Sequence, residues 1–293
     1  MEISDEYIWL EDLSNSKVLR WIDTENKHLR EFLNDLPNVL KDRLTKYFYL
    51  PYIIQLNLTR RGIYVLVREK DSYSVKLISD KDHISEIINS KNLGSNIIIQ
   101  RIYANDHGDL LAYSYSYAGS DVGVLRVIDV DTSEVIDELS GELHDVIWLD
   151  RTKYYYVRFY RAGKTPDGIE APTGRVFLRE SGKDEMVFGK GIGTLYATSL
   201  RKSTDNRKAL ITVVYGWNFS TVYAGDLSNP HSWRPIFNNR KVISIPIDYV
   251  DGHYFILTYD DENGLGRIIK IDRNKCEVII EPTKYPIQQA VIA

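Results

Sequence analysis

The chain has 293 residues, of which 43% are hydrophobic and 27% charged, a globular composition with enough apolar material for a core. Its net charge of −4 gives no basic surplus for nucleic acid or an anionic membrane, so we expect neither as a partner. The acidic start MEISDEY lacks the apolar segment of a signal peptide, and no run approaches the ~18 apolar residues of a membrane span. The single cysteine, Cys276, excludes an internal disulfide and fits a reducing compartment, so we expect a cytoplasmic protein.

An amphipathic helix is predicted near the start, in the stretch YIWLEDLSNSKVLRWIDTENKHLREFL. Ser14 or Asn15 can cap its first turn. Pro37 then suits the first turn of a second helix, PNVLKDRLTKYF, and the helical pattern ends near Pro51. We therefore assign residues 1–51 to an N-terminal helical segment. The apolar residues that share one face of the first helix are Val18, Trp21, Ile22, Leu29, Phe32 and Leu33.

From about Ile53 onward the pattern changes to short β-type runs, such as YVLVRE, LLAYSYSY, YYYVRFY, ALITVVYG and YFILTY, which turn residues separate. The chain contains 21 tyrosines, and tyrosine suits either a half-buried pleated surface or an aromatic binding surface. The run HISEIINSKNL fits either a short helix or an outer strand. These runs predict a mainly β protein behind the helical segment.

A turn followed by an apolar strand recurs along the body of the chain. Its markers lie at intervals of 46, 44, 54 and 46 residues, and the long interval contains the insertion AGKTPDGIEAPTG. Four strands in about 45 residues is the pattern of a β-propeller blade. We expect about five blades within residues 52–293, with YPIQQAVIA as the first strand of a sixth. The markers are Arg61, His107, Arg151, Asp205 and Asp251.

This count predicts an incomplete propeller, because the chain then ends inside a blade. Open blade edges present unpaired backbone groups and bare apolar faces. We therefore expect the isolated chain to self-associate, to bind a complementing fragment or to aggregate. The alternative is a closed ring in which YPIQQAVIA completes the first blade, which would give a stable monomer.

The sequence predicts no catalytic, cofactor-binding or metal-binding residues in this chain. It has no G-x-S-x-G nucleophile elbow, and GKGIG lacks the lysine and hydroxyl residue of a phosphate loop. Ser120 and Asp121 lack a base for the serine and fit a turn. The acidic loop at residues 260–262 fits a solvated turn better than a cation site. His144 and Asp145 open a strand, where core packing or solvent contact is the expected role.

Several motifs resemble the prolyl oligopeptidase family of serine peptidases. That family opens with a Y-x-W-L-E-D segment and a helix with a W/F-x-x-x-x-N core, and its body has a strand pair that ends in a Gly-Ser-Asp turn. The matching residues here are Tyr7, Trp9, Leu10, Glu11 and Asp12, then Trp21 and Asn26, then Gly119, Ser120 and Asp121, and then the strand with Ile147 and Trp148.

The resemblance implies a propeller of the seven-bladed type, preceded by helices that pack on an α/β-hydrolase domain. This hydrolase domain, with its serine, aspartate and histidine, is absent from the chain and is expected as a partner in cis or in trans. The substrates implied are short proline-containing peptides, and the propeller would act as a gate. The chain alone is expected to be inactive.

The resemblance also implies one substrate-facing position, Leu143, where we would expect a larger aromatic side chain. An ordinary buried strand residue is the alternative at this position. Two classes of function remain open. The chain is either the gating propeller of a serine peptidase or a stand-alone propeller scaffold that binds peptides or proteins on its face.

Overall fold

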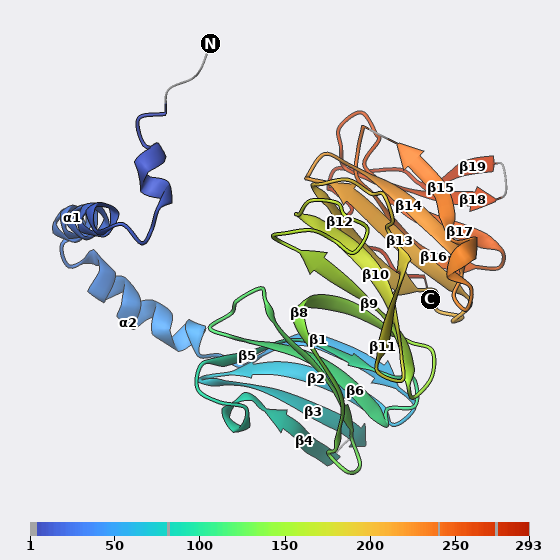
Figure 1. Cartoon of the computed structure of the whole chain (residues 1–293), viewed down its shortest axis with the longest axis horizontal. Helices are drawn as coiled ribbons and strands as arrows, with labels where there is room; N and C mark the ends of the chain where they lie inside the picture. The colour runs from blue at the N-terminus through green and yellow to red at the C-terminus, as the bar shows by residue number, and fades with distance from the viewer. Residues whose placement is uncertain (1–4, 81–82, 240, 273–274, 293) are drawn as a thin grey trace. The chain divides into compact units, whose positions relative to one another are not determined.

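The computed structural model describes residues 5–80, 83–239, 241–272 and 275–292. The chain forms two compact units, and Figure 1 labels most of their helices and strands. The helical unit contains the residues up to Tyr52 together with Glu69–Asp71, and the propeller unit contains Ile53–Arg68 and the residues from Ser72 onward. In the described residues, no helix is both long enough and apolar enough to cross a membrane.

The helical unit consists of η1 (Ile8–Glu11), α1 (Ser16–Leu33) and α2 (Leu36–Phe48). Helix α1 begins at the predicted cap, because the Asn15 side chain accepts a hydrogen bond from the Lys17 N–H at 2.9 Å. Helix α2 begins one residue before Pro37, whose missing N–H costs no hydrogen bond in a first turn. The local signals for both helices are confirmed.

Two tryptophans join η1 to α1. The rings of Trp9 and Trp21 meet edge to face, with centroids 6.1 Å apart and planes at 83°. The Lys17 ammonium lies 4.6 Å from the centroid of the Trp9 ring, and Val18 is completely buried. The W-L-E-D segment is thus anchored on the helix that follows it.

Most of the remaining apolar stripe on the two helices is exposed, whereas Ile22 and Leu33 are partly buried. Phe32 is 85% exposed, although it lies on the same predicted face as Trp21. Exposed apolar residues also continue along α2, and include Leu36, Val39, Leu40, Leu44 and Phe48. We call these residues, together with Trp21, Leu29 and Phe32, the helical apolar stripe.

The described strands pair into two four-stranded sheets and one eleven-stranded sheet. The long sheet divides into three antiparallel blades, joined through β8 and through a single parallel bridge between β10 and β12, so that five blades result (Figure 1). Blade 1 contains β1 (Tyr52–Thr59), β2 (Gly62–Glu69), β3 (Ser72–Asp80) and β4 (His83–Asn89), followed by η2 (Ser90–Asn92). Blade 2 contains β5 (Ile97–Ala104), β6 (Leu110–Tyr117), β7 (Gly123–Asp129) and the first half of β8 (Val135–Trp148). Blade 3 contains the second half of β8, β9 (Lys153–Tyr160), β10 (Thr173–Glu180) and β11 (Lys183–Phe188).

Blade 4 contains β12 (Tyr196–Lys202), β13 (Lys208–Tyr215), β14 (Phe219–Asp226) and β15 (Arg234–Asn239), with η3 (Pro230–Ser232) before the last strand. Blade 5 contains β16 (Ser244–Val250), β17 (His253–Thr258), β18 (Arg267–Asp272) and β19 (Lys275–Ile280). Strand β8 passes from one blade to the next, because residues 135–141 pair with β7 and residues 142–148 pair with β9.

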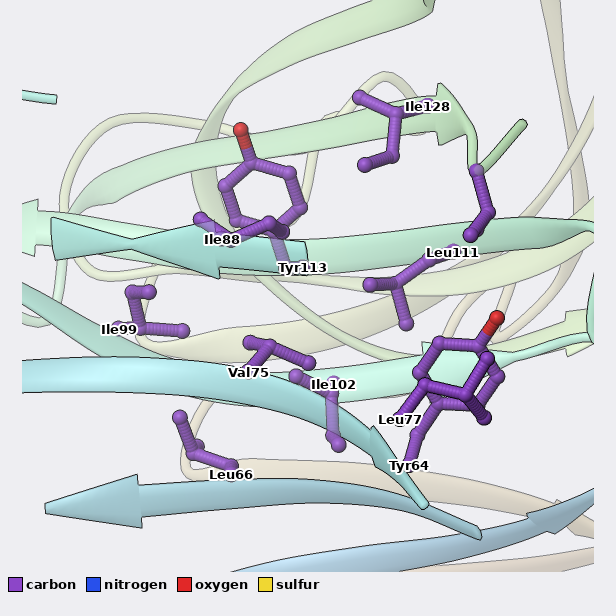
Figure 2. Packing of buried hydrophobic residues seen from close by; sticks show 11 residues of the cluster. Tyr64, Leu66, Val75, Leu77, Ile88, Ile99, Ile102, Leu111, Tyr113 and Ile128 are labelled. Atoms are coloured by element: carbon purple, nitrogen blue, oxygen red, sulfur yellow. The ribbon is translucent and has the colours of Figure 1, made fainter. Parts of the chain in front are cut away.

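Neighbouring blades share a hydrophobic core, because alternate residues of a strand point to opposite faces of its sheet. In β6, Leu111 and Tyr113 belong to the cluster between blades 1 and 2, whereas Leu110 and Ala112 belong to the cluster between blades 2 and 3. Figure 2 shows the first cluster, in which Tyr64 and its blade 1 neighbours meet side chains from blade 2. Two further clusters join blade 3 to blade 4 and blade 4 to blade 5.

The prediction of a mainly β, propeller-type fold behind a helical segment is confirmed. The run HISEIINSKNL resolves into the outer strand β4 and one turn of 3-10 helix, η2. The expected strand in YPIQQAVIA is not formed within the described residues, which end at residue 292. The backbone of Ile287 in this segment instead forms two isolated hydrogen bonds. Its N–H donates to Leu265 O at 2.7 Å, and its carbonyl oxygen accepts from Tyr259 Oη at 2.9 Å.

The insertion AGKTPDGIEAPTG forms the connection between β9 and β10, and a buried ion pair holds it. The side chains of Arg175 and Asp167 are 0% and 4% exposed, and two nitrogens of the guanidinium donate to the carboxylate at 3.0 and 3.2 Å. Arg175 also donates to Thr173 Oγ1 at 2.9 Å and Ile192 O at 2.7 Å, and Gly191 N–H donates to Asp167 at 2.8 Å. Burial would raise the pKa of the Asp167 carboxyl, but these donors hold it well below its usual range.

Candidate functional site

The first strands of successive blades lie next to one another, and side chains link them. Gln55 Nε2 of β1 donates to Ile102 O of β5 at 2.7 Å, and Ile102 N–H donates back to Gln55 Oε1 at 3.0 Å. Farther along, Arg201 Nη1 of β12 donates to Pro246 O of β16 at 2.9 Å. We call β1, β5, residues 142–148 of β8, β12 and β16 the inner strands.

Asp145 links three of the inner strands. Its N–H donates to Tyr103 Oη of β5 at 2.9 Å, and its Oδ2 accepts from the Leu200 N–H of β12 at 2.9 Å. The same Oδ2 lies 3.1 Å from His144 Nδ1. The register of β8 against β9 shifts here, and Asp145 has a φ of 56°, a left-handed conformation for which aspartate is enriched. A β-bulge thus places one residue within reach of the blades on both sides.

The contacts of Asp145 keep its carboxyl group ionised. Burial would raise its pKa, but the hydrogen bonds from His144 and the Leu200 N–H, with Arg101 nearby, lower the pKa below its ordinary value. Burial raises the pKa of the adjacent Tyr103 phenol, which is therefore neutral. Because an ionised carboxylate only accepts hydrogen bonds, the proton between the two groups lies on His144 Nδ1.

A hollow of about 470 Å³ lies on the inner strands of blades 1 to 3. Both of its carboxylates contact Arg161. Glu142 accepts two hydrogen bonds from Arg161, at 2.5 and 3.0 Å, and Asp121 lies 2.7 Å from Arg161 Nη2. The lining residues are Ile54 and Gln55 of β1, Gln100 and Arg101 of β5, Ser114 of β6, Asp121, and Glu142, Leu143 and His144 of β8.

The predicted substrate-facing residue, Leu143, lies mainly in the core. It is 6% exposed and belongs to the cluster between blades 2 and 3. It also lines the hollow beside His144, so a small part of its side chain faces the inner surface. Its contact with a substrate stays a prediction.

The other polar motifs of the sequence have local roles. Ser120 N–H donates to Tyr117 O at 3.0 Å in a turn that contains Gly119, whose φ of 79° favours glycine. Asp261 accepts backbone hydrogen bonds in its own loop, including one from Gly266 N–H at 2.6 Å. In the part of the chain that the structure describes, no cluster of three or more histidine, cysteine, aspartate or glutamate residues is arranged to hold a metal ion.

Sequence reasoning did not single out Arg101 or Tyr103. The available signal for Arg101 was a single cationic residue inside the apolar strand run IIIQRIYA. His144 and Asp145 were noticed, but their link to β5 and β12 depends on a bulge that the period-two pattern does not reveal.

Comparison with known proteins places these features in a family. Residues 1–289 match the family described as prolyl oligopeptidase, N-terminal β-propeller domain. The chain is 23% identical over 308 residues to a prolyl endopeptidase from Elizabethkingia meningoseptica, covering 98% of this chain and 43% of that protein. It is 24% identical over 286 residues to a prolyl endopeptidase from Elizabethkingia miricola, covering 92% of this chain and 40% of that protein.

Solved structures share the fold at lower sequence identity. A chain from a structural and mechanistic analysis of two prolyl endopeptidases has a TM-score of 0.78 at 18% identity, covering 96% of this chain and 44% of that chain. Oligopeptidase B from Leishmania major has a TM-score of 0.71 at 15% identity, covering 95% of this chain and 42% of that chain.

The fold and the inner-strand surface define a β-propeller with a helical N-terminal segment. The chain belongs to the prolyl oligopeptidase family, in which it corresponds to the N-terminal β-propeller domain. It spans 43% and 40% of the lengths of the two Elizabethkingia relatives.

Proposed function

We propose that the chain is the gating propeller of a serine peptidase that cleaves short peptides after proline. An α/β-hydrolase domain, joined in cis or bound in trans, supplies the serine, aspartate and histidine. That domain attacks the prolyl carbonyl and forms an acyl-enzyme, while an oxyanion hole stabilises the developing charge. The propeller contributes no chemical group. It encloses the site and admits only short, unfolded peptides.

The observation that carries the proposal is the helical apolar stripe. Its members, among them Phe32 and Leu44, leave large apolar side chains in water within the family-matched residues 1–289. A helix with an exposed apolar face gains about 25 cal/mol for each Å² that a further domain covers. In our proposal residues 1–51 dock on the hydrolase domain, and residues 52–293 cover its active site.

The coding sequence that follows codon 293 provides the first test. A reading frame with G-x-S-x-G, and then an aspartate and a histidine, would supply the expected partner. The purified chain should then co-elute with the hydrolase domain made from that frame. A chain that remains a stable monomer and ignores the domain would favour a stand-alone scaffold instead.

A further inference from the structure

We propose that Arg101 forms a carboxylate-binding subsite in the hollow on the inner strands. Its ligand is the C-terminal carboxylate or an acidic side chain of a peptide. The choice of a peptide rests on the proposed function, whereas the choice of a carboxylate rests on the charges around Arg101.

Arg101 is held in place by the strand that carries it. The next residue, Ile102, is completely buried, and its backbone N–H and C=O are both bonded to the Gln55 side chain at 3.0 and 2.7 Å. The Arg101 side chain is itself exposed and lines the hollow. A fixed backbone with a solvent-facing guanidinium lowers the ordering cost of binding an anion.

The carboxylates around Arg101 are engaged by other groups. Glu142 is bound by two nitrogens of Arg161, and Asp121, whose side chain is 63% exposed, contacts the same guanidinium at 2.7 Å. The Asp145 carboxylate is held by His144 and by the Leu200 N–H. Among the described residues, Arg101 forms no close ion pair. Its guanidinium lies near the Asp145 carboxylate and the Tyr103 phenol, and its exposed side chain keeps further N–H donors for a ligand in the hollow.

The ring of His144 lies in the same hollow and provides a reporter for binding. Asp145 fixes the ring through Nδ1 at 3.1 Å, and the ring lines the same hollow as Arg101. An exposed guanidinium suits a carboxylate, and about 470 Å³ suits the end of a peptide.

Peptide titration of the full chain, read at the ring of His144, tests the subsite. Its NMR signal is assigned by comparison with His144→Gln. The three probes are Ac-Ala-Pro-Gly as the free acid, the same peptide as its amide, and an amidated peptide that contains one aspartate. We expect the free acid, the aspartate peptide or both to move the His144 signal and to saturate, and the plain amide to bind far more weakly.

Three variants identify the group responsible. Arg101→Gln should weaken binding of the acidic probes by roughly tenfold or more, the range of one charged hydrogen bond. Arg101→Lys keeps the charge and should retain part of the affinity. Arg60→Gln removes an exposed arginine from the turn after β1 and is the matched control, which should bind like the wild type.

The outcomes separate the two carboxylate sources and the two proposals. Binding of the free acid alone assigns the C-terminus, and binding of the aspartate peptide alone assigns an acidic side chain. Equal binding of the plain amide, unchanged binding by Arg101→Gln, or no response at His144 would overturn the subsite. If the chain nevertheless docks on a hydrolase domain, only the subsite is lost. If docking fails while acidic peptides bind, the gating function is lost and the subsite stands.

Discussion

Replacing Arg175 with alanine should destabilise the propeller unit by about 3–5 kcal/mol, the cost of breaking a buried ion pair. This magnitude follows from the surroundings of the pair. Both side chains are almost completely buried, so the variant leaves the Asp167 carboxylate without its cation. Ile192 O loses its donor at the same time, because Arg175 Nη2 binds it at 2.7 Å.

Thermal unfolding followed by circular dichroism at pH 7.5 measures the effect. For a unit of this size the loss corresponds to a fall in Tm of roughly 10 °C. The pH dependence adds a second readout, because the folded pKa of Asp167 lies below its ordinary value of about 3.9. Its contribution to stability is therefore present above pH ~4 and is lost as the pH falls through the folded pKa, and Asp167→Asn should lack this loss.

The matched control is Arg207→Ala. Arg207 also pairs with an aspartate, Asp205, but its side chain is exposed, so we expect no measurable change in Tm. If Arg175→Ala melts within about 1 °C of the wild type, the buried pair does not stabilise the β9–β10 connection and the reasoning from burial is wrong.

Three other variants test the core, the inner strands and the helices. Leu143→Ala should lower the free energy of unfolding by about 2–4 kcal/mol in denaturant titration, and an unchanged midpoint would show that the residue is not core. Asp145→Asn should lower the Tm at pH 7, because the contacts that lower the pKa of Asp145 stabilise its ionised form. The difference in Tm from the wild type should shrink as the pH falls below about 4, where the wild-type carboxylate becomes protonated. Trp21→Ala should leave the melting of the propeller unit unchanged but abolish co-elution with a hydrolase domain, whereas unfolded blades would mean that our separation into two units is wrong.

Much of the fold could be predicted because its signals are local. Asn15 caps α1 through a bond to a residue two positions away, and Pro37 fixes the start of α2. The blades follow from period-two strands and a repeat near 45 residues, and these patterns need no knowledge of distant contacts.

The inner-strand site could not be predicted, because it depends on residues far apart in the sequence. Asp145 bonds to the Leu200 N–H, 55 positions away, and to Tyr103 Oη, 42 positions away. Both contacts require the bulge in β8, which reorients Asp145 relative to the regular strand. The amino-acid composition of the strand gives no sign of this bulge. The pair of Arg175 and Asp167 was missed for another reason, since a charge in an insertion and a charge in the strand that follows it look like two solvated charges in a sequence.

The measurement that tests the central claim most directly is the hydrolysis of a proline-containing chromogenic peptide. The purified chain is assayed alone and with a hydrolase domain of the family, before and after treatment with a serine-directed phosphonate. Our account predicts no turnover by the chain alone, and phosphonate-sensitive turnover when the hydrolase domain is added. Turnover by the chain alone that the phosphonate blocks would contradict it, because the chain would then hold its own nucleophile.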